Sequence, residues 1–172
     1  APGEPAAAGP PAWVYAHGTL MALAWAVFIP GGILAARPAS RRRMGPKWLR
    51  VHLGLQLTGL LTGGVGIAIS ISNVGVGSLH GIIGLVVMGL GVLQPINAAF
   101  RPHPPASAES SGAAHKSATD GARGGGGGAS SSKKTKARRV WEVLHKSIGY
   151  SVFILALANI VVGGYVAMDS YR

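Results

Sequence analysis

The chain has 172 residues, of which 48% are hydrophobic and 12% are charged, and its formal net charge at pH 7 is +11. The mean hydropathy of +0.36 is typical of a small helical membrane domain rather than of a soluble protein. The absence of cysteine excludes disulfides, thiolate-held iron–sulfur clusters and covalently attached c-type haem. Because the cations gather in two loops between apolar segments, their pattern indicates orientation in a membrane rather than a surface for nucleic acid.

Along the chain, a linker rich in Pro, Ala and Gly comes first, over residues 1–12, and such a linker usually joins a further domain upstream. Each apolar segment that follows has about the 20 residues needed to cross a bilayer. We expect membrane-spanning helices at about 13–36, 48–71, 79–100 and 140–168. Pro30, followed by two glycines, should kink the first helix near its end. Residues 101–139 are rich in Pro, Ser and Gly and are expected to form a disordered loop. The sequence therefore predicts an all-α membrane protein, with an antiparallel bundle of four transmembrane helices over residues 13–172.

The orientation of this bundle follows from its loops. The loop between the first two spans carries six Lys and Arg residues, and the loop between the last two carries eight. Residues 1–16 and the turn at 72–78 carry none. Since Lys and Arg are retained on the cytosolic side, both basic loops should face the cytosol and both chain ends should face away from it.

One histidine lies near the start of each span: His17, His52, His80 and His145. An ionisable residue inside a membrane span is a candidate functional residue. Because consecutive spans are antiparallel, His17 and His80 should share the non-cytosolic leaflet, and His52 and His145 the cytosolic leaflet. Two parallel helices with one histidine each can hold one metal centre between them. His103 and His115 fall in the polar loop and are interpreted as solvated.

Two imidazoles without a nearby Asp, Glu or Cys fit zinc poorly. They fit the two axial positions of a haem iron, which would then pass electrons rather than bind a ligand. A porphyrin also needs small residues beside it, and the glycines of the spans provide room either for it or for close helix contacts. These glycines are Gly54, Gly59, Gly63, Gly64, Gly66, Gly81, Gly84, Gly89, Gly149, Gly163 and Gly164. A single such histidine could equally be a hydrogen-bond partner between helices, but two like-sided pairs favour the haem sites.

Four cations precede the two histidines on the cytosolic side. Lys47 and Arg50 come shortly before His52, and Arg138 and Arg139 come shortly before His145. These side chains would ring the cytosolic haem edge, where they could hold propionates or attract an anionic reductant such as ascorbate.

The motifs at these residues resemble the cytochrome b561 family, in particular the transmembrane module found behind a DOMON domain. The matching segments are His17-Gly-Thr-Leu-Met-Ala-Leu-Ala-Trp25, Trp48-Leu-Arg-Val-His52-Leu-Gly-Leu-Gln56, His80-Gly-Ile-Ile-Gly84, Leu93-Gln94 with Arg101-Pro102, and Trp141-Glu-Val-Leu-His145-Lys-Ser-Ile-Gly149-Tyr150. The resemblance implies two b-type haems, one held by His17 with His80 and the other by His52 with His145. It also implies a transmembrane oxidoreductase that moves electrons from cytosolic ascorbate to an outer acceptor such as ferric chelate or monodehydroascorbate.

In that family, basic residues before the second and fourth core histidines contact ascorbate, and they correspond here to Lys47, Arg50 and Arg139. The other expected partners are a lipid bilayer, an upstream DOMON-like domain and a second copy of the chain. Nucleic acid is not expected to bind. Stand-alone members usually have six spans and DOMON-linked members five, so this chain carries the four core spans alone.

Two other functions remain open from the sequence. The histidines could relay protons or bind a transition metal in a haem-free transporter, although such a protein should have acidic residues in its spans. Between Trp48 and Phe100 there is none. The chain could also be a membrane anchor that positions an extracellular domain.

Overall fold

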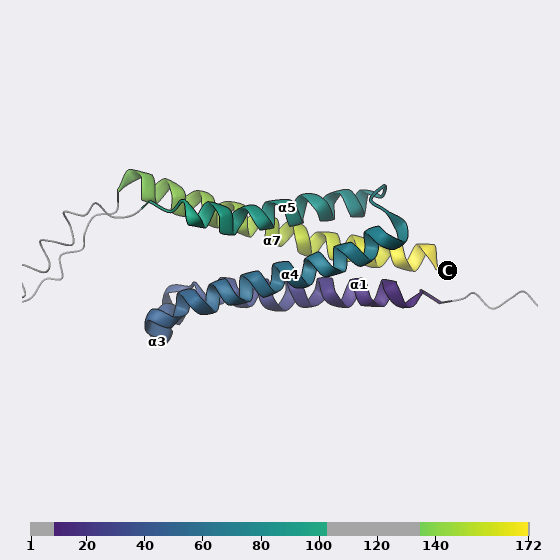
Figure 1. The fold of residues 1–172 in the computed structure, drawn as a ribbon, viewed down its shortest axis with the longest axis horizontal. Helices are drawn as coiled ribbons and strands as arrows, with labels where there is room; N and C mark the ends of the chain where they lie inside the picture. The colour runs from purple at the N-terminus through teal and green to yellow at the C-terminus, as the bar shows by residue number, and fades with distance from the viewer. Residues whose placement is uncertain (1–8, 103–134, 172) are drawn as a thin grey trace, which may run out of the picture.

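The structure is a computed structural model that describes residues 9–102 and 135–171. Four helical segments within these residues are long and apolar enough to cross a membrane: Ala12–Ala35, Pro38–Val74, Leu79–Ala99 and Lys136–Ser170. This confirms the predicted all-α fold with four spans. Most of the linker expected at 1–12 and most of the loop expected at 101–139 lie outside the described residues. In Figure 1 the start of the first helix and the end of the last lie at the same end of the bundle, as four antiparallel spans require.

The first span changes its helical geometry halfway along. It consists of α1 (Ala12–Ala22), a π-helical segment (Leu23–Phe28) and α2 (Ile29–Ala35). Pro30 has no N–H, and its ring would clash with the carbonyl group of Ala26 in a regular α-helix. A wider π-helical turn relieves this conflict, so the irregularity expected at Pro30 lies in the turn that precedes it.

The first basic loop is helical. Arg37 is extended, as a residue before proline prefers, and α3 (Pro38–Met44) begins immediately after it. Gly45, with a φ of 55°, ends α3, because few other residues adopt this backbone conformation. A short 3₁₀ helix (Gly45–Lys47) then leads directly into α4 (Trp48–Val74). This connection therefore holds its cations in a defined arrangement.

The other helices begin at side-chain caps. Ser78 accepts a hydrogen bond from the backbone N–H of Gly81 (3.0 Å) at the start of α5 (Leu79–Ala99). Thr135 accepts one from the backbone N–H of Arg138 (3.3 Å) at the start of α7 (Lys136–Ser170). The last span is therefore longer than the apolar segment that predicted it, and its first turn carries basic residues.

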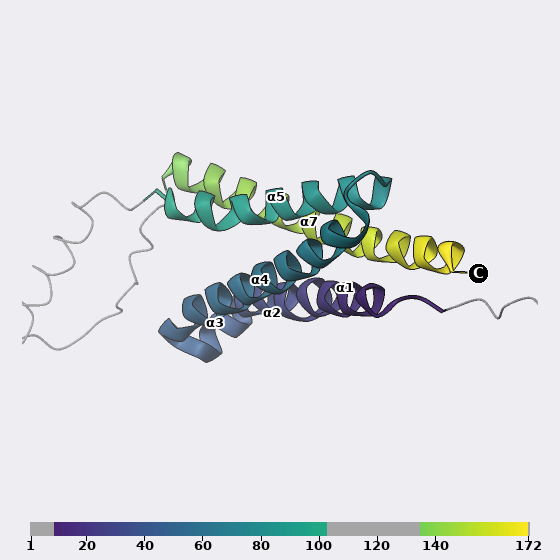
Figure 2. The ribbon, with the colours of Figure 1, turned by 45° about the vertical axis from the view of Figure 1, so that its right-hand side comes forward.

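The four spans pack as two antiparallel pairs. The first span contacts α4 along its length, α5 contacts α7, and contacts of α4 with α5 and of α1 with α7 close the bundle. Figures 1 and 2 show these pairs from two directions. As a result α1 lies diagonally opposite α5, and α4 lies diagonally opposite α7. Each diagonal joins two parallel helices, and each carries one of the predicted histidine pairs.

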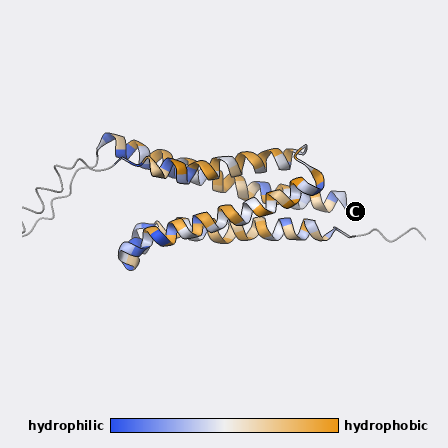
Figure 3. Ribbon diagram, viewed as in Figure 1, coloured by the Kyte–Doolittle hydropathy of each residue, from blue (hydrophilic) through white to orange (hydrophobic). Residues whose placement is uncertain are grey.

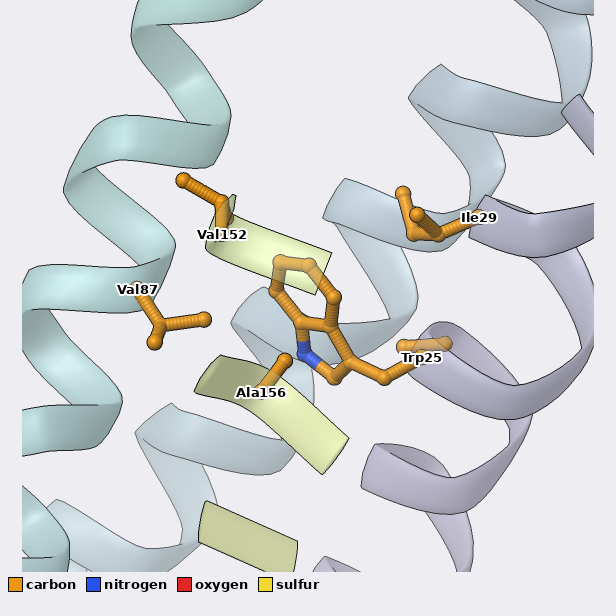
Figure 4. Close-up of a cluster of buried hydrophobic side chains, with 6 residues drawn as sticks. Trp25, Ile29, Val87, Val152 and Ala156 are labelled. Carbon is orange, nitrogen blue, oxygen red and sulfur yellow. The ribbon is translucent and has the colours of Figure 1, made fainter. Parts of the chain in front are cut away.

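Trp25 occupies the middle of the bundle. It is 4% exposed and packs among Ile29, Val87, Val152 and Ala156 (Figure 4). Its contacts are those of a core residue. Apolar side chains cover most of the outer surface, and hydrophilic residues gather at the end where α3 and the start of α7 lie (Figure 3). Such a surface suits contact with lipid.

We expect Trp25→Ala to lower the free energy of unfolding by about 3 kcal/mol, because it removes a buried indole and leaves a cavity. Leu61→Ala is the matched control, since Leu61 is 72% exposed on the lipid-facing surface. Its effect should stay below about 1 kcal/mol. Thermal unfolding of both variants in the same detergent measures the difference, and equal losses of stability would contradict the assignment of Trp25 to the core.

Candidate functional site: two histidine pairs

His17 and His80 face each other across the centre of the bundle. His17 lies on α1 and His80 on α5, and their ring centroids are 6.0 Å apart with an interplanar angle of 82°. Two metal–imidazole bonds of about 2.0 Å would place the ring centres about 6 Å apart. A cavity of about 270 Å³ opens beside both rings and is lined also by Gly84, Asn159 and Gly163. The pair therefore has a spacing that fits two axial ligands of one haem iron.

Three of the four histidines have the same orientation relative to a neighbouring helix. Nδ1 lies 2.8 Å from the carbonyl oxygen of Gly66 in His17, and 2.8 Å from that of Gly32 in His52. In His80 it lies 3.1 Å from the carbonyl oxygen of Asn159. A carbonyl can only accept, so Nδ1 carries the proton and donates it. Each ring then keeps Nε2 as the nitrogen with a free lone pair, which is the arrangement that metal-ligating histidines adopt.

The imidazole of His80 is enclosed by α7. Asn159 donates from its side-chain Nδ2 to the main-chain carbonyl oxygen of His80 (3.2 Å). The main-chain carbonyl oxygen of Asn159 in turn accepts from Nδ1 of the His80 ring. Gly163 lies one turn further, and a Cβ built on it would be 2.5 Å from Cε1 of His80. The ring therefore lies directly on the backbone of α7, at a position where only glycine leaves it enough room.

His52 and His145 lie at the other end of the bundle, on α4 and α7. Both are half-buried. Each has a tryptophan four residues before it on its own helix. Trp141 stacks on His145, with centroids 5.0 Å apart and planes at 12°, and Trp48 lies tilted beside His52 at 6.4 Å. These two histidines therefore lie at the same end of the bundle, each beside a tryptophan of its own helix.

An arginine lies over each tryptophan, and Trp141 also forms a hydrogen bond. Arg41 of α3 lies over the ring of Trp48 at 4.7 Å. Arg101 lies over the ring of Trp141 at 5.8 Å, and the Trp141 indole N–H donates to the carbonyl oxygen of Asn97 (3.0 Å). Sequence reasoning missed the contact of these tryptophans with the histidines. The signal was present, since residues four apart are neighbours on a helix.

The four cations predicted to contact a substrate have different environments. Lys47 and Arg50 are exposed and line a surface depression together with Val51. Arg139 is also exposed. Arg138 forms an ion pair with Glu142, with Nε 3.5 Å from Oε1. Its charge is thus partly neutralised, and the other three are better suited to an anionic molecule.

Within the described parts of the chain, no group of three or more His, Cys, Asp or Glu side chains is placed to hold a metal ion. Each predicted pair in this part of the chain consists of two imidazoles alone. His103 and His115 lie outside the described residues.

Comparison with known proteins agrees with this geometry. The family model described as eukaryotic cytochrome b561 matches residues 16–111, which is more than half of the chain and includes His17, His52 and His80. The chain belongs to the cytochrome b561 family. Membership confirms the resemblance noted in the sequence, and the family's general properties are transmembrane electron transfer and the binding of haem b.

Several curated Arabidopsis thaliana proteins are similar to the chain. A cytochrome b561, DM13 and DOMON domain-containing protein is 29% identical over 150 residues, covering 86% of this chain and 14% of that protein. Two cytochrome b561 and DOMON domain-containing proteins are 26% and 29% identical over 153 residues, covering 86% of this chain and 31% and 27% of their own lengths. The chain thus spans less than a third of these relatives. No solved structure matches it significantly.

Proposed function

We propose that this cytochrome b561 domain carries electrons across the membrane through two haem b groups, one held by His17 and His80 and the other by His52 and His145. The observation that supports this most directly is the His17–His80 pair, with ring centroids 6.0 Å apart. Its Nδ1 atoms are already engaged by backbone carbonyls, which leaves the two Nε2 atoms as the available ligands.

Haem iron supplies a carrier that accepts and releases one electron at a time. The protein contributes position. Because α1 is diagonal to α5 and α4 to α7, each histidine pair spans the centre of the bundle at one of its ends. Two centres at the two ends would divide a hydrocarbon layer of about 30 Å into shorter steps. The apolar helices exclude water from the path between them.

The basic end of the bundle is proposed to face the cytosol. The first turns of α4 and α7 and all of α3 lie at this end, and most of the cations of the described residues are on them. The positive-inside bias gives this orientation, and it places His52 and His145 on the cytosolic side.

Cytosolic ascorbate is proposed as the electron donor. Lys47 and Arg50 lie at the N-terminus of α4, and Arg139 lies in the first turns of α7. Helix N-termini and cations both attract anions, so this end of the bundle favours an ascorbate monoanion. The donor loses one electron and one proton to become monodehydroascorbate, and the proton goes to water. One electron then reduces one ferric chelate on the other side, or one monodehydroascorbate, which also takes up one proton from water.

We expect Arg50→Ala to raise the KM for ascorbate about tenfold while the haem content stays unchanged, because the variant removes an exposed cation beside the proposed entry point. Arg138→Ala is the matched control, since Arg138 is paired with Glu142. Its KM should change less than about threefold. Stopped-flow reduction of the purified protein at several ascorbate concentrations measures both. An unchanged KM in Arg50→Ala would exclude Arg50 from the donor site.

An upstream DOMON-like domain is proposed as a partner on the non-cytosolic side, because the similar Arabidopsis proteins are named for such a domain and are much longer than this chain. The first described residues, at the start of α1, lie at the end of the bundle away from the basic residues (Figure 1). A domain joined there would be near the His17–His80 pair.

Reconstitution into vesicles tests the proposed function as a whole. Ascorbate is trapped inside, ferric chelate is added outside, and ferrous product is followed with a chelating dye. Protein oriented with its basic end inward should produce ferrous iron, and protein-free vesicles should not. Proton or metal flux without haem and without ferrous product would favour a transporter instead.

A further inference from the structure

Four buried side-chain atoms of the described residues have no hydrogen-bond partner, and two of them, Nε of Arg138 and Oδ1 of Asn159, belong to side chains that contact Glu142 and His80. The other two are Nδ1 of His145 on α7 and Oε1 of Gln94 on α5. One is a ring nitrogen that can carry a proton, and the other is an acceptor. Buried polar groups are rarely left unpaired, because each costs about 1–3 kcal/mol when it is. Two complementary unpaired groups on neighbouring helices call for a common explanation.

The register between α5 and α7 brings the two residues to the same level. The Trp141 indole contacts the carbonyl oxygen of Asn97, and a Cβ built on Gly149 would lie 4.0 Å from Oε1 of Gln94. His145 lies halfway between Trp141 and Gly149 and on the same face of α7, since the three are four residues apart. It therefore faces the turn of α5 that begins at Gln94.

The other three histidines show what His145 lacks. Each of them donates from Nδ1 to a backbone carbonyl of the helix packed against it: His17 to Gly66, His52 to Gly32, and His80 to Asn159. Gln56, one turn after His52, is not used in this way, because its amide donates to the carbonyl oxygen of Ile29 (3.2 Å). Gln94, on the α5–α7 pair, has an unpaired side-chain oxygen.

We propose that the side-chain oxygen of Gln94 accepts the Nδ1–H of His145 and makes Gln94 the positioning residue of that histidine. This inference rests on the proposed role of His145 as a haem ligand. A hydrogen bond to Nδ1–H raises the basicity of a ligating imidazole and favours ferric over ferrous iron. Gln94 therefore lowers the reduction potential of the haem on the cytosolic side, through a bond that one substitution can remove.

The test is a redox titration of the purified holoprotein carrying Gln94→Met, which keeps the length of the side chain and removes the acceptor. The potential of one haem should rise by about 59 mV, which corresponds to a tenfold shift of a one-electron equilibrium. Gln56→Met is the matched control, since it makes the same change beside the other ligand of the same haem. It should shift that potential by less than a third as much, because His52 keeps its bond to Gly32.

Equal shifts in the two variants, or no shift in Gln94→Met, would overturn the role of Gln94 and indicate that His145 donates to the main chain. ¹⁵N NMR of histidine-labelled wild-type holoprotein gives an answer that does not depend on either variant folding. Among the six histidines, a hydrogen-bonded Nδ1–H at His145 supports the proposal together with the shift in Gln94→Met, and a free Nδ1–H at His145 contradicts it. Absence of haem from the wild type, or full haem content in His145→Ala, would instead refute the proposed function on which this inference rests.

Discussion

Replacing His52 with alanine is expected to lower the haem content from two per chain to one and to abolish electron transfer across the membrane. The substitution removes an axial ligand of the proposed cytosolic haem, and a porphyrin held from one side by His145 alone would lose most of its affinity. It also removes the hydrogen bond from the ring to the carbonyl oxygen of Gly32. The remaining haem, at His17 and His80, would have no partner through which to receive electrons from the cytosol.

Haem-to-protein ratios and transfer rates in vesicles measure this result. His103→Ala is the control, because it removes a histidine of the same chain that lies outside the proposed sites. It should leave two haems and at least half of the wild-type rate. A His52→Ala protein that retained two haems would show that His52 is not a ligand.

The second large effect on haem content is expected when a single methyl group is added at Gly163. In Gly163→Ala the new Cβ would lie 2.5 Å from Cε1 and 3.1 Å from both ring nitrogens of His80. The ring cannot move away freely, since its Nδ1–H is bonded to the carbonyl oxygen of Asn159. We therefore expect His80 to be displaced and the haem of the His17–His80 pair to be lost, so that the ratio falls toward one haem per chain.

Gly89→Ala on α5 provides the comparison, because, apart from the adjoining residues and backbone of its own helix, no atom lies within 4 Å of its built Cβ. That variant should keep both haems and should gain slightly in helix stability. A redox titration identifies which component disappears from Gly163→Ala. If both components persist with unchanged potentials, the His80 ring does not lie where the structure has it.

Sequence reasoning reached the spans and the grouping of the histidines because both depend on coarse quantities. Span length follows from bilayer thickness, and the end at which a histidine lies follows from the alternating direction of the helices. His17 and His80 could therefore be assigned to one end without any knowledge of packing. The helical form of α3 was not predicted, because its three consecutive arginines were interpreted as part of a basic loop. Pro38 and Gly45, which mark the two ends of α3, were the available signal.

The roles of the individual glycines could not be predicted. Gly59 and Gly63 lie against side chains of neighbouring helices, and Gly163 lies against the His80 ring. Gly54 and Gly64, on the same helix as the first two, have no atom within 4 Å of a built Cβ. The sequence alone does not distinguish glycines at helix contacts from glycines on the outer surface. The rotation of each helix about its axis decides which glycines face a neighbouring helix. The same rotation decides that Asn159 orients a histidine, a role that a lone amide in a span does not reveal.

The most direct test of the two-haem account is a spectroscopic count on the purified protein. Haem quantification together with near-infrared magnetic circular dichroism, which distinguishes axial ligand pairs, should give two haem b groups per chain, both low-spin with two histidine ligands. A ratio of one or zero, or a high-spin centre with an open axial position, would contradict it.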